Sequence, residues 1–264
     1  SGRQGIRVGA GNTGRSDKER PSAPAATLAA VPAEHLPFQY IAVDGPIGVG
    51  KTTLVELLTR RFEGVKLLED VDNPFLPEFY REKPGSAFQT ELYFLLSRFK
   101  QQQDALQRDL FDRLLLADYT FQKNRIFAYL NLDDSELMLF DKLYALLEPQ
   151  VPVPDLVLYL VADLETCLAR IKKRRQAGRR KGAPGYLEDL FQAEKEISPR
   201  YLSELIDAYN HYYHYYQRSP LLVVDTRHLD FPQRAEDLDE LIHRLARPIK
   251  GTEYFVPLGS RKTR

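Results

Sequence analysis

The sequence is poor in several residue types that would define other classes of protein. Among 264 residues it has one cysteine, Cys167, one methionine and no tryptophan. A single cysteine excludes an internal disulfide framework and is typical of a reducing compartment. No apolar run approaches the roughly 18 residues that a membrane-spanning helix needs. We therefore predict a cytoplasmic protein without a membrane partner.

The chain also lacks net charge, because 37 Lys and Arg residues balance 37 Asp and Glu residues. No overall basic field favours nucleic acid, so we predict no nucleic-acid partner. Residues 1–36 are rich in Gly, Arg, Ser, Ala and Pro without periodicity, which predicts a disordered tail or linker. An organellar transit peptide and a linker from an upstream domain both stay open. We expect one domain over residues 37–247 and a C-terminal tail over 248–264.

One glycine-rich stretch matches the phosphate-binding loop pattern G-x-x-x-x-G-K-[ST]. It consists of Gly45, Pro46, Ile47, Gly48, Val49, Gly50, Lys51 and Thr52. An apolar strand pattern over 39–44 precedes it, and helical spacing of apolar residues follows from Thr53. The glycines let backbone N–H groups converge on phosphates, which the lysine and the helix N-terminus also attract. We predict that this loop and Thr53 bind ATP, with Mg²⁺ on the Thr52 hydroxyl.

Short apolar segments alternate with helical patterns along the rest of the chain. The predicted strands are 39–44, 64–68, 113–117, 156–161 and 221–224. Such alternation predicts an α/β fold in which helices cover both faces of a parallel sheet. Glu69, Asp70, Asp118 and Asp225 each follow a strand directly. Because ligands bind beyond the carboxyl ends of parallel strands, we expect these acids near the phosphate site.

A phosphate-binding loop occurs in GTPases, ATPases and small-molecule kinases alike. The sequence has no N-K-x-D motif, which counts against a GTPase. The chain is short for a motor protein, and its neutral charge is poor for a helicase. A small-molecule kinase is the best remaining class.

Several further motifs resemble the deoxynucleoside kinase family, nearest its bacterial deoxyadenosine/deoxyguanosine kinase branch. They are Asp44 to Thr53, Leu67-Leu68-Glu69-Asp70, Asn73-Pro74-Phe75, Phe88-Gln89-Thr90, Leu96-Ser97-Arg98, Arg125-Ile126-Phe127-Ala128 and Tyr201-Leu202. The resemblance implies transfer of a phosphoryl group from ATP to the 5′-hydroxyl of a deoxynucleoside, with purines preferred, in nucleotide salvage. It also implies a P-loop kinase fold of five parallel strands, an Arg-rich lid and a homodimer.

The resemblance assigns roles to the acids that follow the strands. Glu69 matches the general base for the sugar hydroxyl, and Asp70 is the alternative base. Glu69 could also be a solvated loop residue without a role in the reaction. Asp118 follows its strand as a metal-binding aspartate does and could hold Mg²⁺ with Thr52. The family's better-known branch has Glu-Arg-Ser where this chain has Ala117-Asp118-Tyr119. The arginine that would assist the base is therefore absent, and Asp118 could instead cap the next helix.

The nucleoside-binding residues also follow from the resemblance. Gln89 matches a glutamine that binds the base, and relatives have an arginine seven residues later. Here Arg98 is nine residues after Gln89 but seven after Glu91. One of the two therefore faces the base, and we favour Gln89. Tyr80 matches a tyrosine at the sugar 3′-hydroxyl, or is a packed loop aromatic, and Glu194 aligns with a lid glutamate that reaches the sugar.

A basic cluster over residues 170–181 matches the family's lid. Arg170 and Arg174, one helical turn apart, match arginines that offset charge on the transferring phosphoryl group. The cluster could also be a solvated basic face, and which lid arginines act stays open. Two other readings of the whole chain remain. One is a thymidylate-type nucleoside monophosphate kinase, and the other is a nucleotide-binding regulatory module without catalysis.

Overall fold

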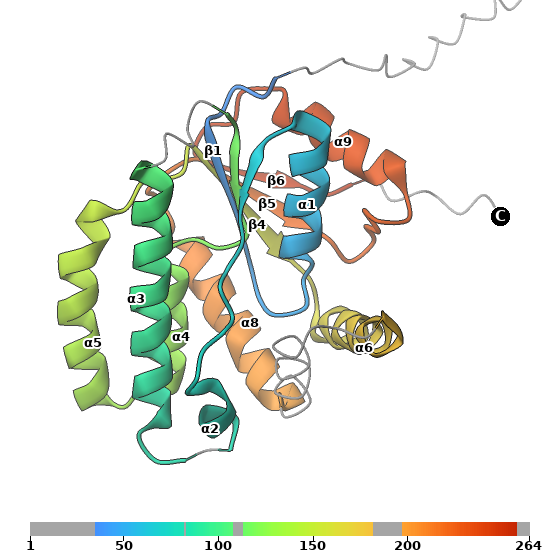
Figure 1. Cartoon of the computed structure of the whole chain (residues 1–264). Helices are drawn as coiled ribbons and strands as arrows, with labels where there is room; N and C mark the ends of the chain where they lie inside the picture. The colour runs from blue at the N-terminus through green and yellow to red at the C-terminus, as the bar shows by residue number, and fades with distance from the viewer. Residues whose placement is uncertain (1–34, 82, 108–112, 182–196, 258–264) are drawn as a thin grey trace, which may run out of the picture. The chain divides into compact units, whose positions relative to one another are not determined.

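The computed structural model describes residues 35–81, 83–107, 113–181 and 197–257. The tail predicted over residues 1–36 falls almost entirely outside these ranges, as does Glu194. Within the described ranges, a parallel sheet carries helices on both sides. Figure 1 shows α1 on one side of the sheet and α3, α4, α5 and α8 gathered on the other.

The sheet has six strands in the order β2-β3-β1-β4-β5-β6, and every adjacent pair is parallel. The strands are β1 Tyr40–Asp44, β2 Val65–Leu67, β3 Leu115–Ala117, β4 Leu156–Val161, β5 Leu221–Asp225 and β6 Thr252–Phe255. All residues of β1 and β3 are buried, as expected for central parallel strands covered on both faces. The α/β fold predicted from the alternation is confirmed.

The prediction of five strands was one strand short. The sixth strand, β6, lies within the segment predicted as a C-terminal tail and pairs with β5. It is a short edge strand in which Phe255 is buried while Thr252 and Tyr254 are exposed. Four residues that are largely exposed carry little apolar signal, so the pattern did not reveal the strand.

Helices connect most of the strands and supply the apolar faces that cover the sheet. They are α1 Lys51–Phe62, α2 Leu76–Tyr80, α3 Ser86–Gln107, α4 Lys123–Asn131, α5 Asp134–Leu147, α6 Leu164–Lys181, α8 Pro199–His214 and α9 Ala235–Leu245, with the 3₁₀ helix η2 Glu148–Gln150. Asp133 is the N-cap of α5, because its carboxylate accepts hydrogen bonds from the backbone of Ser135 and Glu136. Glu136 returns a bond to the Asp133 backbone, which completes a capping box.

The main core lies between the sheet and its helices. Leu54, Val55 and Leu58 of α1 are fully buried in it, and so are Leu202 and Leu205 of α8. A second, smaller apolar cluster joins α3, α4 and α5. These two clusters fix the helices around the carboxyl ends of the strands, where the phosphate-binding loop lies.

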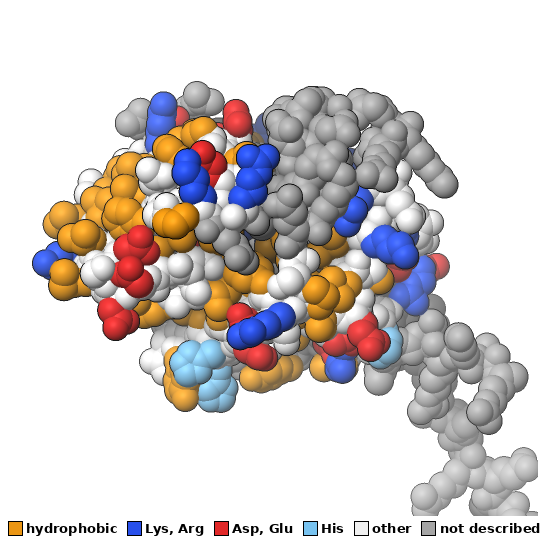
Figure 2. All heavy atoms as spheres, turned by 90° about the horizontal axis from the view of Figure 1, so that it is seen from below, with side chains coloured by type: hydrophobic (Ala, Val, Ile, Leu, Met, Phe, Trp, Pro, Cys, Tyr) orange, Lys and Arg blue, Asp and Glu red, His pale blue; other side chains and the backbone are white. Residues whose placement is uncertain are grey.

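Exposed apolar side chains concentrate on α5. Met138, Leu139 and Leu146 are each more than half exposed. Figure 2 shows orange apolar atoms gathered at the left of the molecule, on the side where Figure 1 places α5. No helix in the described ranges combines the length and the apolar character that crossing a membrane would take.

Candidate active site

The loop between β1 and α1 has the backbone geometry of a phosphate cradle. Gly45, Gly48 and Gly50 have φ angles of 145°, 84° and 109°, which L-residues with side chains rarely adopt. A Cβ atom on Gly48 would also lie 2.8 Å from the Cys167 carbonyl oxygen of α6. The loop therefore needs glycine here both for its conformation and for the close approach of α6.

The Lys51 side chain folds back and hydrogen-bonds to the start of the loop. Its Nζ donates to the carbonyl oxygens of Gly45 at 2.8 Å and Pro46 at 3.1 Å. Burial, with the neighbouring Lys123 charge, lowers the pKa of Lys51 to about 8. An incoming phosphate would supply the opposite charge that this partly desolvated ammonium lacks.

Thr52, Asp118 and Glu69 form a chain of hydrogen bonds between the loop and β2. The Thr52 hydroxyl donates to Asp118 Oδ2 at 2.6 Å, and the Glu69 backbone N–H donates to Asp118 Oδ1 at 2.7 Å. The sequence prediction that Glu69 and Asp118 meet beside the loop therefore holds in the structure. Burial and the Glu69 charge raise the pKa of Asp118.

A hydroxyl and a carboxylate side by side fit Mg²⁺, which takes one or two protein oxygens and completes its shell with water and substrate phosphates. Thr52 and Asp118 would hold this ion at the edge of the phosphate-binding loop. The hydrogen bond between them shows that both oxygens point to the same place. Asp118 does not cap the next helix, since α4 begins five residues later at Lys123.

The Glu69 carboxylate is held by two cations. Lys123 Nζ donates to Oε2 at 2.5 Å, while Arg98 donates to Oε1 from Nε at 2.9 Å and also from Nη2. The three side chains are 14% exposed or less. Burial alone would raise the pKa of Glu69, but Lys123 and Arg98 together bring it well below its usual range. Glu69 is thus ionised, as a general base must be.

The two other acids predicted for this region lie elsewhere. Asp70 is exposed and accepts a hydrogen bond from the backbone N–H of Asp72. Asp225 accepts from the side chain of Arg227, two residues along the chain. Neither carboxylate joins the group around Glu69.

The structure separates Gln89 from Glu91 on α3. Gln89 is exposed, whereas Glu91 is 2% exposed and shares the buried face of the helix with Arg98. Glu91 Oε1 accepts a 2.8 Å hydrogen bond from Asn131 Nδ2 of α4. Which of the two residues faces the base stays a prediction, but Glu91 rather than Gln89 shares the buried face of α3 with Arg98. The seven-residue spacing to Arg98 is the signal in the sequence that indicates this shared face.

A buried network also anchors the start of the loop. Asp44, the last residue of β1, accepts hydrogen bonds from Thr120 at 2.6 Å and from Tyr213 at 2.7 Å. The Gly45 backbone N–H donates to the same carboxylate at 2.8 Å. The Tyr213 ring stacks on Tyr159 of β4 with centroids 4.3 Å apart. This network links α8 and β4 to the first residue of the phosphate-binding loop.

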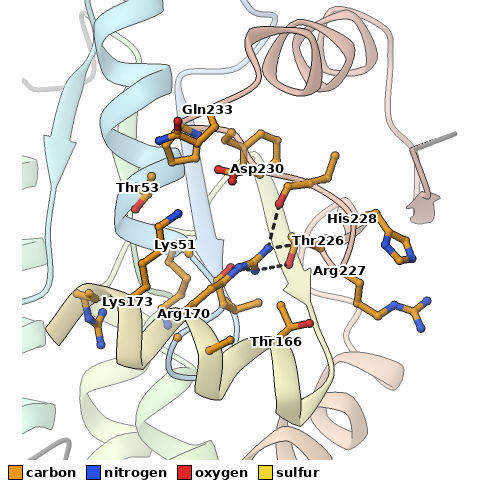
Figure 3. Close-up of a pocket in the computed structure, with 18 of the residues that line it drawn as sticks. Lys51, Thr53, Thr166, Arg170, Lys173, Thr226, Arg227, His228, Asp230 and Gln233 are labelled. Atoms are coloured by element: carbon orange, nitrogen blue, oxygen red, sulfur yellow. Dashed lines mark hydrogen bonds between the residues drawn. The ribbon is translucent and has the colours of Figure 1, made fainter. Parts of the chain in front are cut away.

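A cavity of about 690 Å³ opens next to the loop. It is lined by Gly48 to Thr53, by α6 residues including Lys173 and Arg174, and by the segment Thr226–Arg234 after β5. Arg170 reaches across it from α6 (Figure 3) and donates to the carbonyl oxygens of Val49, Thr226 and Leu229. Arg174 lies on the wall of the same cavity with its side chain exposed. The shape and lining suit a nucleotide whose phosphates lie in the loop.

Tyr80 and Glu194 cannot be placed in the site, whereas Lys123 is in the site but was not predicted. The side chain of Tyr80, like Glu194, lies outside what the structure describes, although Tyr80 itself ends α2. Sequence reasoning missed Lys123, whose burial beside Glu69 results from how α4 packs against α3. The one available signal was its position just before the recognised motif at Arg125–Ala128.

The parallel sheet, the phosphate-binding loop and the buried carboxylate beside it define a P-loop phosphotransferase. The family model described as deoxynucleoside kinase matches residues 41–250, so the chain belongs to the deoxynucleoside kinase family. The predictions of fold, family and reaction class are confirmed.

Individual relatives agree with this assignment. The chain is 38% identical over 168 residues to the deoxyguanosine kinase of Bacillus subtilis, covering 62% of this chain and 80% of that one. It is 29% identical over 224 residues to the deoxyadenosine/deoxycytidine kinase of the same organism, covering 80% and 94%. The structure of the M. mycoides deoxyadenosine kinase with bound dATP superposes with a TM-score of 0.63 at 22% identity, covering 79% of this chain and all of that one.

Proposed function

We propose that this protein transfers the γ-phosphoryl group of ATP to the 5′-hydroxyl of a purine deoxynucleoside, in nucleotide salvage. The observation that carries the proposal is the ionised, partly buried Glu69 carboxylate between Lys123 and Arg98. The Glu69 backbone N–H donates to Asp118, which also accepts from Thr52, so Glu69 is fixed beside the phosphate-binding loop. A base so close to a phosphate site suits the deprotonation of an alcohol that attacks phosphorus. Relatives named for deoxyguanosine and deoxyadenosine support purine acceptors.

Each residue of the site has a part in this reaction. The loop amides and Lys51 hold the triphosphate, and Glu69 accepts the proton of the 5′-hydroxyl. Mg²⁺ on Thr52 and Asp118 would neutralise charge on the outer phosphates. Arg170 ties the loop to the segment after β5, which shapes the nucleotide cavity. Arg174, Tyr80 and Glu194 remain proposed contacts to phosphate and sugar.

Lys123 and Arg98 take the place of the arginine that this chain lacks at Ala117-Asp118-Tyr119. Both cations contact the Glu69 carboxylate directly. Lys123 is also near enough to Lys51 to lower the pKa of that lysine. A cation that contacts the base and acts on the phosphate-binding lysine can stabilise negative charge that develops during transfer. The absence of the family's arginine, where this chain has Asp118, is therefore compatible with catalysis.

The test is a panel of the four deoxynucleosides and thymidine monophosphate, each with ATP and Mg²⁺, in which ADP release is measured. Release with deoxyguanosine or deoxyadenosine is expected. Release with thymidine monophosphate alone would favour the nucleoside monophosphate kinase. Nucleotide binding with no release on any acceptor would favour the regulatory module.

Two further properties remain proposals. We propose a homodimer, because Met138, Leu139 and Leu146 leave an apolar strip on α5 that a second copy could cover. Sedimentation velocity would measure the mass in solution. A cytoplasmic location follows only from the single cysteine and the lack of long apolar runs, and fractionation of cells would test it.

A further inference from the structure

Glu91 is a buried carboxylate that the reaction described above does not use. It is 2% exposed, and Asn131 is its one hydrogen-bond donor among the residues that the structure describes. A carboxylate has two oxygens and about four acceptor positions, so most of its capacity is unused. Buried acids without a full set of donors are costly and are found where a ligand completes them.

The position of Glu91 relative to Glu69 matches the length of a nucleoside. Arg98 contacts Glu69, the proposed base at the 5′-hydroxyl. Glu91 lies seven residues before Arg98 on the same face of α3, which is about 10 Å along the helix axis. A nucleoside that presents its 5′-hydroxyl to Glu69 can therefore bring its base to Glu91.

The charges around Glu91 are complementary to guanine. Guanine carries two adjacent donors, N1–H and N2–H₂, which match the two oxygens of one carboxylate. Adenine instead places an unprotonated N1 acceptor on the same edge, and a carboxylate repels it. A neutral amide at this position would serve adenine better, because it offers a donor and an acceptor.

We propose that Glu91 accepts hydrogen bonds from N1–H and N2–H₂ of guanine and so selects deoxyguanosine over deoxyadenosine. This inference rests on the proposed function and specifies its substrate. The named relatives do not decide the point, since they include both deoxyguanosine and deoxyadenosine kinases.

The selection depends on the ionised form of Glu91. Burial, with a contribution from the Glu69 charge, raises the pKa of Glu91 to about 7 against the opposing effects of Asn131, Arg98 and Lys123. Above that pH the carboxylate accepts two bonds, and below it the protonated acid can donate to adenine N1. The ratio of deoxyguanosine to deoxyadenosine activity therefore rises between pH 6 and pH 8.

The experiment compares kcat/KM for deoxyguanosine, deoxyinosine and deoxyadenosine at pH 8 in the wild type, in Glu91→Gln and in Glu204→Gln. Deoxyinosine keeps N1–H but lacks the 2-amino group. Because a bidentate contact is lost with deoxyadenosine, we expect the wild type to prefer deoxyguanosine over deoxyadenosine by about 10- to 100-fold. Deoxyinosine falls between them. Glu91→Gln reverses the preference, and Glu204→Gln, an exposed change on α8, keeps it.

Several outcomes overturn the inference while the proposed function stands. They are a wild type that uses both purines equally or favours deoxyadenosine, and a Glu91→Gln variant with an unchanged ratio. If Glu91→Gln lacks a cooperative thermal transition, the wild-type comparison decides alone, and equal values for deoxyguanosine and deoxyinosine overturn the inference. A wild type that phosphorylates no deoxynucleoside refutes the proposed function itself.

Discussion

Replacing Lys123 with methionine removes one of the two cations that hold Glu69. Lys123 Nζ lies 2.5 Å from Glu69 Oε2, and the two side chains are 7% and 14% exposed. Removing one partner of a buried ion pair lowers the free energy of unfolding by about 3–5 kcal/mol. Here Arg98 still pairs with Glu69, and methionine fills much of the volume of the lysine. We therefore expect the free energy of unfolding to fall by about 2 kcal/mol. For a chain of this size that lowers Tm by about 4–8 °C. Scanning calorimetry at pH 7 measures the shift.

The effect of Lys123→Met also has a defined pH dependence. A carboxylate whose pKa is lowered on folding stabilises the protein above its unfolded pKa of about 4.3, and this stability is lost as pH falls. The variant raises the pKa of Glu69, so its deficit in Tm is full at pH 7 and shrinks below about pH 4. We also expect kcat to fall by about 100-fold, since a group that stabilises developing charge is lost.

Lys66→Met is the matched control for this experiment. Lys66 forms a 3.8 Å ion pair with Glu56, but its side chain is 48% exposed and that of Glu56 39%. Exposed pairs contribute about 0–1 kcal/mol, so Tm and kcat should hardly change. The reasoning about the Glu69 cluster is refuted if Lys123→Met matches Lys66→Met in both quantities.

Three other substitutions probe the nucleotide site. Gly48→Ala places a Cβ 2.8 Å from the Cys167 carbonyl oxygen at a φ of 84°, so we expect ATP binding, measured by calorimetry, to weaken by at least about tenfold, and wild-type affinity would contradict the steric argument. Asp118→Asn removes the charge beside Thr52, so the Mg²⁺ concentration for half-maximal ADP release should rise about tenfold, and an unchanged titration would remove Asp118 from the metal site. Arg170→Met removes the hydrogen bonds to Val49, Thr226 and Leu229, so KM for ATP should rise about tenfold. An unaltered KM would show that these hydrogen bonds do not shape the ATP site.

Local patterns predicted the parts of the fold that depend on short-range physics. The phosphate-binding loop requires glycines and a lysine at fixed spacing, and the Asp133 cap requires an acceptor before a helix, so both can be read from neighbouring residues. The central strands are apolar throughout because helices cover both of their faces. The edge strand β6 is half exposed and lacks that signal.

The composition of the site was harder to predict, because burial of charge depends on packing between distant elements. Glu69 and Asp118 were found since each follows a strand. Lys123 was missed because a lysine at the start of a helix is ordinarily solvated, and only the approach of α3 and α4 buries it against Glu69. An amide offers a base both a donor and an acceptor, which favoured Gln89, whereas the seven-residue repeat from Arg98 places Glu91 on the buried face of α3.

The turnover of Glu69→Gln with a purine deoxynucleoside tests the central claim most directly. Glutamine keeps the size of the side chain but cannot accept the proton of the 5′-hydroxyl. We predict that kcat falls by about 10²- to 10⁴-fold while ATP still binds, because general-base catalysis contributes about that much. A Glu69→Gln protein that turns over within a few-fold of the wild type would contradict the account, since the carboxylate beside the phosphate-binding loop would then not be the base.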